Sequence, residues 1–310
     1  MILVYQLANL QKIVSSRLIM RKAVFRYCLV LLFSILGTKA FSQSEGLLND
    51  PVLPDSLLND RYLSYQYYKT HFWDECKLND SLLYGNPAYA KRLDAFFDKV
   101  VAPLPDSINT EIDRLIGKIG NKTVRDFTLW YLLNKYEHPE YMTHDKVFIH
   151  LADDYFLVDD SIEGLNEANR FFIAAQSGNL KRLALFQPAP ELCLHDTNNQ
   201  YIETQSIESD YLILFFYDYD CEVCQAEAND LKALVQRRND VKIYAVDMNY
   251  DFRPIDESFI NVSAIAPRGL DPTDAYSIEN TPLIYVLDKE KRIIAKKLKS
   301  EQVELFLEFN

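Results

Sequence analysis

Two cysteines with two residues between them, Cys221 and Cys224, are the side chains in this sequence best suited to chemistry. They follow an apolar run at 211–217 and open a helical pattern at 222–238. The N-terminus of a helix has unpaired N–H groups and a partial positive charge, which stabilise a thiolate at the first cysteine. The second cysteine lies one turn farther into the helix, where its sulfur can attack a mixed disulfide. The spacing therefore predicts thiol-disulfide exchange, with Cys221 as the nucleophile and Cys224 as the resolving thiol.

Zinc sites and structural disulfides also use cysteines at this spacing. Zinc requires two more ligands, but the second half of the sequence has neither another Cys-x-x-Cys nor a pair of histidines, since His195 is its only histidine. A cysteine peroxidase is expected to have a threonine three residues before its reactive cysteine, where this sequence has Asp218. We therefore favour a redox-active pair that holds no metal, with a structural disulfide as the alternative.

Three carboxylates flank the first cysteine in the sequence: Asp218, Asp220 and Glu222. Their negative charge opposes the helix dipole and disfavours the thiolate of Cys221. A less stabilised thiolate shifts the cysteine pair toward its disulfide form. The sequence thus predicts a protein that is poised to act as a reductant.

The region around the cysteines alternates between strands and helices. Strand-like runs occur at 192–195, 211–217, 241–246 and 283–287, with the helical pattern 222–238 between two of them. The run 211–217 is apolar on both faces, which is typical of a central strand. This order predicts an α/β domain over 179–310, built as an open sheet flanked by helices.

Residues 56–178 have a helical pattern instead. We expect helices at 87–100, 106–119, 123–133, 145–157 and 163–176, which together form an all-α domain with an aromatic core. Trp130 and His150 are assigned to that core, because an aromatic stripe at helical spacing is more often core than pocket. Cys76 and Cys193 are interpreted as lone or structural thiols. Residues 43–55 lack periodicity and are predicted to be a linker.

The N-terminus has the pattern of a secretion signal that begins at Met20. Basic residues at 21–26 precede an apolar run at 28–36, and small residues precede Gln43. We therefore expect residues 1–42 to be a signal peptide with a misassigned upstream start, so that translation begins near Met20. An uncleaved N-terminal anchor is the alternative.

The charge of the remaining chain is strongly negative. Residues 1–42 hold six of the 33 basic residues and no acidic residue, so their removal leaves 27 basic against 45 acidic residues. Such a surface repels phosphate backbones and anionic lipid headgroups. The composition argues against binding to nucleic acid or to a membrane surface.

Four segments in a fixed order carry a resemblance to a known family. They are 185–192 (LFQPAPEL), the apolar run 211–217, 221–227 (CEVCQAE) and 276–282 (YSIENTP). Over residues 180–310 the chain resembles the TlpA/ResA-type periplasmic members of the thioredoxin superfamily. The resemblance implies a thioredoxin fold in which Thr281 and Pro282 form a cis-proline loop beside the disulfide, where the backbone pairs with the substrate chain. Glu227 matches the family's acidic residue after the second cysteine, which implies a role in proton handling.

The sequence departs from the family pattern next to the cysteines. The family usually has a tryptophan at or near the residue before the first cysteine, where this chain has Asp220. It also usually has a proline between the cysteines, where this chain has Glu222 and Val223. Residues 56–178, in turn, resemble a helical domain of unknown function that precedes thioredoxin-like modules in Gram-negative envelope proteins, most clearly at 127–136 and 147–153.

These observations predict a periplasmic thiol-disulfide oxidoreductase that reduces or isomerises disulfides of exported proteins. It would need no cofactor beyond its own redox-active disulfide, and a membrane-bound electron donor would recharge it. The alternative is a non-catalytic envelope protein for binding or scaffolding, in which the thioredoxin-like fold carries a structural disulfide. The acidic Cys-x-x-Cys without proline keeps this alternative open.

Overall fold

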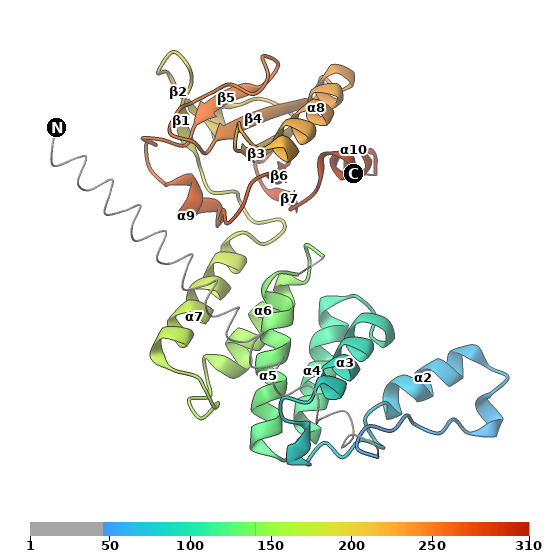
Figure 1. The fold of residues 1–310 in the computed structure, drawn as a ribbon. Coiled ribbons are helices and arrows are strands. Elements are labelled where there is room, and N and C mark those ends of the chain that lie inside the picture. Colours follow the sequence, from blue (N-terminus) through green and yellow to red (C-terminus); the bar gives the residue numbers. More distant parts are fainter. Residues whose placement is uncertain (1–45, 140, 310) are drawn as a thin grey trace. The chain divides into compact units, whose positions relative to one another are not determined.

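The computed structural model of the chain describes residues 46–139 and 141–309 (Figure 1). The predicted signal peptide at 1–42, with Cys28, lies outside the described residues. The chain divides into two compact units. The first contains the described residues up to Pro103 together with Ser107–Tyr131, and the second contains Leu104–Asp106 and the residues from Leu132 onward. No helix among the described residues is both long and apolar enough to cross a membrane.

The N-terminal part of the described chain is largely helical, as predicted. Its α-helices are α2 (Arg61–His71), α3 (Pro87–Ala95), α4 (Pro105–Lys118), α5 (Lys122–Glu137), α6 (Asp145–Leu151) and α7 (Glu167–Arg182). The π-helical turns η4 (Phe96–Val100) and η5 (Ala152–Phe156) extend α3 and α6, and the 3-10 turns η2 (Asp55–Leu57) and η3 (Ser81–Leu83) lie before α3. The predicted ranges 87–100 and 145–157 thus correspond to a helix and its π-helical extension.

Two helices differ from the sequence-based expectation. Helix α7 begins four residues later than expected, because Asn166 caps it by accepting a hydrogen bond from Asn169 N at 2.9 Å. Helix α2 was not predicted. It buries none of its residues, so it lacks the apolar stripe by which a helix is recognised in a sequence.

Aromatic side chains form much of the core of the first unit, as expected. Phe96 lies 4.7 Å from Phe72 and 5.2 Å from Trp73 between ring centroids, and all three are buried. Trp130 and His150, which were assigned to the core, are only half-buried. The aromatic core is therefore correct for the first unit, but Trp130 of that unit and His150 of the second unit are not fully buried.

The second unit contains a seven-stranded sheet in the order β2-β1-β5-β4-β3-β6-β7. The strands are β1 (Cys193–His195), β2 (Tyr201–Glu203), β3 (Tyr211–Tyr217), β4 (Val241–Asp247), β5 (Ile260–Ser263), β6 (Leu283–Leu287) and β7 (Ile293–Lys296). The helices α8 (Glu222–Arg237), α9 (Pro272–Tyr276) and α10 (Ser300–Glu308) and the turn η6 (Thr204–Ser206) complete this part of the chain. Strands β3, β4 and β5 are parallel, whereas β6 and β7 are antiparallel to their neighbours. The predicted open α/β sheet is confirmed.

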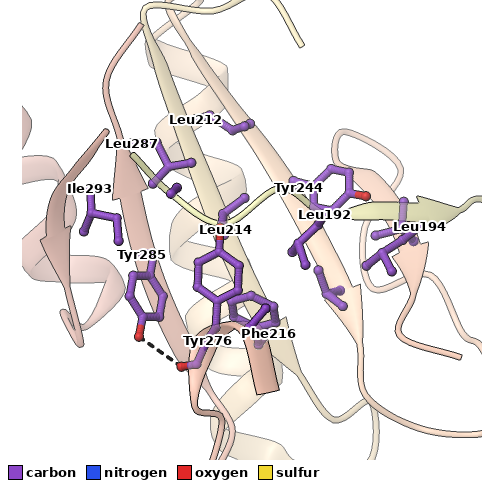
Figure 2. Packing of buried hydrophobic residues seen from close by; sticks show 14 of the residues in the cluster. Leu192, Leu194, Leu212, Leu214, Phe216, Tyr244, Tyr276, Tyr285, Leu287 and Ile293 are labelled. Atoms are coloured by element: carbon purple, nitrogen blue, oxygen red, sulfur yellow. Dashed lines mark hydrogen bonds between the residues drawn. The ribbon is translucent and has the colours of Figure 1, made fainter. Parts of the chain in front are cut away.

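Strand β3 has apolar side chains on both faces, as a central strand should. Leu212, Leu214 and Phe216 lie on one face, in the cluster that also holds the hydrogen-bonded tyrosines of α9 and β6 (Figure 2). Phe215 and Tyr217 lie on the opposite face and pack with the buried side of α8. The alternation with period two therefore lets one strand contribute side chains to both cores.

The register of β3 and β6 determines what lies next to the two cysteines. Strand β6 runs antiparallel to β3 with Leu283 opposite Phe216. The residues just before β6 consequently lie beside the residues that follow β3. This register brings the Thr281-Pro282 step to the loop that carries Cys221.

A buried ion pair links helix α6 to the edge of the sheet within the second unit. The ammonium of Lys296 on β7 pairs with the carboxylate of Asp145 and donates a hydrogen bond to the carbonyl of Leu183 at 2.6 Å. Both charged side chains are buried, and burial lowers the pKa of Lys296. A charge pair removed from water in this way depends on both of its partners, so it fixes α6 against β7.

Candidate redox site

The first cysteine of the pair caps helix α8. Cys221 has an extended backbone, and its sulfur accepts a hydrogen bond from Cys224 N at 3.2 Å. Its carbonyl accepts a hydrogen bond from Gln225 N at 3.1 Å, so α8 starts immediately after this residue. The Cys221 sulfur thus lies where the N–H groups and the positive end of the helix dipole act most strongly.

The second cysteine lies one turn farther into the helix and is buried. Cys224 has no exposed surface, whereas Cys221 is partly exposed. Burial raises the pKa of the Cys224 thiol to about 12, and the neighbouring Cys221 adds to the rise. Hydrogen bonds with the Thr281 side chain and the Asp218 backbone act in the opposite direction. Cys224 is therefore held as a neutral thiol, and the accessible sulfur is that of Cys221.

The predicted cis-proline loop lies next to the buried cysteine. The Thr281-Pro282 peptide is cis, as the family resemblance implied, and the Thr281 side chain hydrogen-bonds with Cys224. Thr281 also lines an open cavity of about 380 Å³, together with Met248, Ile278, Glu279 and Asn280. The structure thus brings Thr281 together with the Cys-x-x-Cys motif, while the role of Thr281 and Pro282 in binding substrate stays a prediction.

Two of the three carboxylates flanking Cys221 have partners that the sequence analysis did not foresee. Both oxygens of Asp220 accept hydrogen bonds from the Arg253 guanidinium, at 2.8 Å and 2.5 Å. Asn249 donates to Asp218 at 2.8 Å. The hydrogen bond with Arg253 lowers the pKa of Asp220. A guanidinium therefore balances one of the three charges that were expected to disfavour the Cys221 thiolate.

Arg253 and Asn249 belong to the loop after β4, which buried groups hold in place. Asp247, at the end of β4, accepts hydrogen bonds from Asn249 N at 3.0 Å and Arg253 N at 2.8 Å. The Tyr217 hydroxyl donates to the Arg253 carbonyl at 2.7 Å. Burial raises the pKa of Asp247, although its two N–H partners favour the carboxylate. Asn249, Arg253 and Asp247 were not identified from the sequence as part of the site. The one feature in the sequence that pointed to them is the carboxylate of Asp247 at the end of an apolar strand.

Glu227 has a partner on another helix. Its carboxylate accepts a hydrogen bond from Ser300 N, the first residue of α10, at 2.5 Å. The Ser300 hydroxyl donates to Asp230 at 2.9 Å, so two acids of α8 bind the start of α10. Glu227 is half-buried and satisfies a helix N-terminus, which is a structural task. Its predicted role in proton handling stays a prediction.

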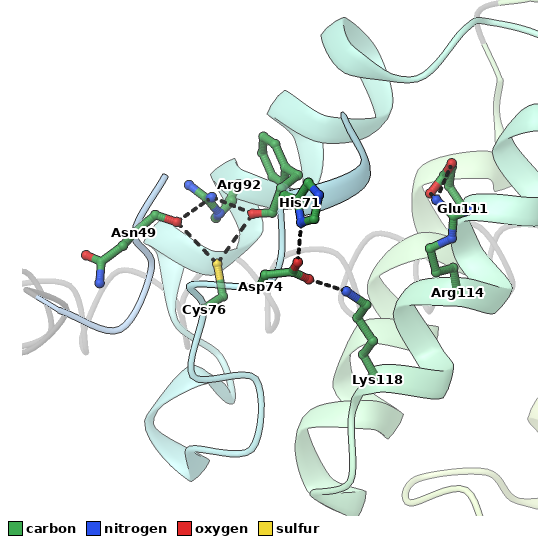
Figure 3. A network of polar contacts seen from close by, with 9 residues as sticks. Asn49, His71, Asp74, Cys76, Arg92, Glu111, Arg114 and Lys118 are labelled. Atoms are coloured by element: carbon green, nitrogen blue, oxygen red, sulfur yellow. Dashed lines mark hydrogen bonds and ion pairs between the residues drawn. The ribbon is translucent and has the colours of Figure 1, made fainter. Parts of the chain in front are cut away.

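The other two described cysteines lie elsewhere and are unpaired thiols. Cys193 is in β1. Cys76 belongs to the first unit, where its sulfur lies 3.7 Å from the Asn49 carbonyl and 3.8 Å from the Phe72 carbonyl (Figure 3). Burial raises the pKa of both thiols. Their interpretation as lone thiols is consistent with these positions.

Comparison with protein families gives two matches along the chain. Residues 34–175 match a domain of unknown function (DUF5106), and residues 185–296 match the AhpC/TSA family. The two matches follow the predicted order of a helical domain and a thioredoxin-like domain. A search among curated proteins gives no relative of the chain. The narrower resemblance to TlpA/ResA-type proteins stays a prediction.

Several solved structures are similar to the chain or to a part of it. A thioredoxin-like protein from Bacteroides caccae aligns with a TM-score of 0.65 and 16% sequence identity. The alignment covers 85% of this chain and 98% of the Bacteroides caccae chain. "A domain of possible thiol-disulfide isomerase" from Cytophaga hutchinsonii is 30% identical over 41% of this chain and 92% of its own, with a TM-score of 0.37. The thioredoxin domain of a thiol-disulfide oxidoreductase from Bacteroides vulgatus is 23% identical over 40% of this chain and 98% of its own, with a TM-score of 0.34. The first of these structures shares the fold of the chain.

Proposed function

Because the chain carries a thioredoxin-like domain of the AhpC/TSA family behind a DUF5106 domain, we propose that it is a thiol-disulfide oxidoreductase that acts on exported proteins. The observation that carries the proposal is the asymmetry of the two sulfurs. Cys221 is partly exposed at the start of α8, whereas Cys224 is buried one turn inside the helix. Two-step disulfide exchange requires such an accessible nucleophile in front of a protected second thiol.

The proposed reaction reduces a substrate disulfide in two steps. The Cys221 thiolate attacks one substrate sulfur, which forms a mixed disulfide and releases the other substrate sulfur as a thiolate. Cys224 then gives up its proton and attacks the Cys221 sulfur, so that the bound substrate sulfur leaves. The proton of Cys224 passes to a released substrate sulfur. The substrate gains two electrons, and the protein ends with a disulfide between Cys221 and Cys224.

The second step requires deprotonation of a thiol whose pKa burial has raised to about 12. Glu227 is the proposed group for handling this proton, since it lies one turn after Cys224 on the same helix. Thr281 is the proposed contact for substrate, because its side chain reaches Cys224 and it lines the open cavity beside the motif. In this proposal the chain's own residues carry out every step.

The compartment and partners are proposed from the sequence. The pattern of residues 21–42 favours export, and an exported reductant needs an external source of two electrons for each turnover. A membrane-bound donor that reduces the disulfide between Cys221 and Cys224 would supply them. Disulfides of exported proteins in the periplasm would be the substrates.

Reduction of insulin disulfides by the purified protein, with dithiothreitol as the electron source, tests the proposal. We expect the protein to accelerate insulin precipitation and the Cys221→Ser variant to match the rate without protein. Cys193→Ser is the matched control, because it removes a thiol of the same domain that lies outside the motif. A wild-type rate equal to that of Cys221→Ser would favour the non-catalytic alternative.

A further inference from the structure

We propose that Arg253 is a positioning residue that sets the reactivity of Cys221 by neutralising Asp220. This inference rests on the proposed function, since it concerns the nucleophile of that reaction. Asp220 is the residue directly before Cys221, and Arg253 comes from the loop after β4, 33 residues farther along the chain. The pair therefore joins the motif to a different strand of the sheet.

The Arg253 side chain holds the loop before Cys221 through two contacts. Its guanidinium binds both oxygens of Asp220, and such a paired geometry fixes the direction of the carboxylate. The same guanidinium lies 4.4 Å from the centroid of the Tyr219 ring. Gln225 donates to the Tyr219 carbonyl at 2.8 Å and so closes this loop onto α8. Arg253 thus contacts two successive residues that precede the nucleophile.

Buried groups fix the backbone from which Arg253 reaches this loop. The carboxylate of Asp247, which has no exposed surface, accepts a hydrogen bond from the Arg253 N–H. The hydroxyl of the buried Tyr217 donates a hydrogen bond to the Arg253 carbonyl. Both N–H and C=O of Arg253 are therefore tied to the ends of β4 and β3. With the backbone anchored in this way, only the side-chain freedom of Arg253 remains to be lost when its guanidinium binds Asp220.

The charge of Asp220 is the quantity that Arg253 controls. The titratable and charged groups of the segments that meet next to Cys221 are Asp218, Tyr219 and Asp220 in the preceding loop, Glu222 and Cys224 on α8, Asp247 at the end of β4, Tyr250, Asp251 and Arg253 in the loop after it, and Glu279 before the cis-proline. Arg253 is the single cation in this group, so without it every carboxylate would oppose the thiolate. With Arg253 in place, the carboxylate adjacent to the nucleophile is compensated.

The exposure of this ion pair limits its contribution to folding stability. The side chains of Arg253 and Asp220 are 39% and 72% exposed, and exposed pairs contribute little to folding. Helix α8 offers a matched control at its opposite end, where Arg237 binds both oxygens of Glu304 at 3.0 Å and 2.7 Å. That pair is also bidentate, through Nε and one Nη instead of two Nη atoms, and it is also exposed, but it lies far along the helix from Cys221.

The test measures the rate at which iodoacetamide alkylates Cys221 as a function of pH, in the full protein, with the labelled peptide identified by mass spectrometry. Removal of the guanidinium in Arg253→Gln leaves a carboxylate beside the sulfur, so we expect alkylation at pH 7 to slow by about two- to fivefold. The alkylation midpoint should move to higher pH. Asp220→Asn leaves the cation instead and should speed alkylation by a similar factor.

Three further variants separate charge from simple loop disruption. Asp220→Asn combined with Arg253→Gln restores neutrality and should return the rate to that of the wild type. Arg253→Lys keeps the charge and should do the same, and Arg237→Gln should change nothing. The proposal is overturned if Asp220→Asn slows alkylation as much as Arg253→Gln, or if the double variant is slower than both single ones. Alkylation needs only the thiol, so a failure of insulin reduction would refute the proposed function without deciding this test.

Discussion

Each compact unit of this protein places a cysteine near an arginine, and the two settings differ in what the sulfur can do. In the first unit, Arg92 faces Cys76 directly and donates to the Asn49 and Phe72 carbonyls, both at 2.8 Å (Figure 3). Burial outweighs the cation there and raises the pKa of Cys76. In the second unit, Arg253 binds the carboxylate of Asp220, and the Cys221 sulfur instead contacts the N-terminus of α8.

The comparison shows that a nearby cation does not make a redox centre. Among the described residues, the Cys76 sulfur neither caps a helix nor pairs with a second cysteine, and the Arg92 guanidinium is occupied by two backbone carbonyls and the Asp50 carboxylate. Cys221 has both the helix N-terminus and the resolving thiol. Four predictions test this difference, in order of decreasing effect.

The largest effect is expected from Cys224→Ser, which removes the resolving thiol but leaves the nucleophile. Mixed disulfides between Cys221 and substrate proteins should accumulate, because nothing in the motif can release them. They should appear as adducts on a non-reducing gel and disappear with dithiothreitol. Adding Cys221→Ser should abolish the adducts, whereas adding Cys76→Ser should leave them. Adducts that disappear when Cys76 is replaced would contradict the claim that Cys221, and not Cys76, is the redox-active thiol.

Thiol labelling should separate the cysteines by their surroundings. Burial raises the pKa of the native Cys224 thiol to about 12, so this thiol is protonated at pH 8. Iodoacetamide at pH 8 should therefore modify Cys221 first, Cys76 more slowly and Cys224 only after unfolding. Because the native fold favours the protonated Cys224, its contribution to stability is complete below the pKa of an unfolded cysteine and is lost as pH rises toward 12. Native labelling of Cys224 ahead of Cys221 at pH 8 would contradict this assignment.

Replacing Arg92 should lower the stability of the first unit, whereas replacing Arg253 should change the reactivity of Cys221 in the second. Arg92→Gln leaves the carbonyl of the buried Phe72 without its donor and should destabilise the first unit by about 1 kcal/mol. Both tryptophans, Trp73 and Trp130, lie in that unit, so their fluorescence during urea unfolding reports on it. Arg253→Gln should leave the tryptophan-detected transition unchanged and slow Cys221 alkylation. An unchanged transition in Arg92→Gln would show that these hydrogen bonds are dispensable.

The smallest effect is expected at Glu227, which binds the first residue of α10. Glu227→Ala removes an acceptor at a helix N-terminus and should cost about 1 kcal/mol of stability, measured by circular dichroism during urea unfolding. Glu227→Gln retains an acceptor oxygen and should unfold like the wild type. Slower insulin reduction by Glu227→Gln at unchanged stability would support the predicted proton-handling role.

Much of the site could be predicted because its signals are local. The apolar run of β3, the cysteines that follow it and the periodic pattern of α8 are adjacent in the sequence, and hydrophobic periodicity dictates such elements. The cis Thr281-Pro282 step directly before β6 was implied by the resemblance to TlpA/ResA-type proteins, and its cis peptide agrees with that implication. Helix α2 escaped because it buries nothing and so has no pattern to detect.

What only the tertiary structure decided is the pairing of charges across distant segments. Asp220 with Arg253, Glu227 with Ser300, and Asp145 with Lys296 each join residues from different elements. Sequence alone showed acids around Cys221 but not the cation that balances one of them. A strand pattern specifies which face is buried, but strand register and the path of each loop determine which side chains meet. Those depend on the packing of the whole sheet, so the electrostatics of the nucleophile could be derived only from the folded chain.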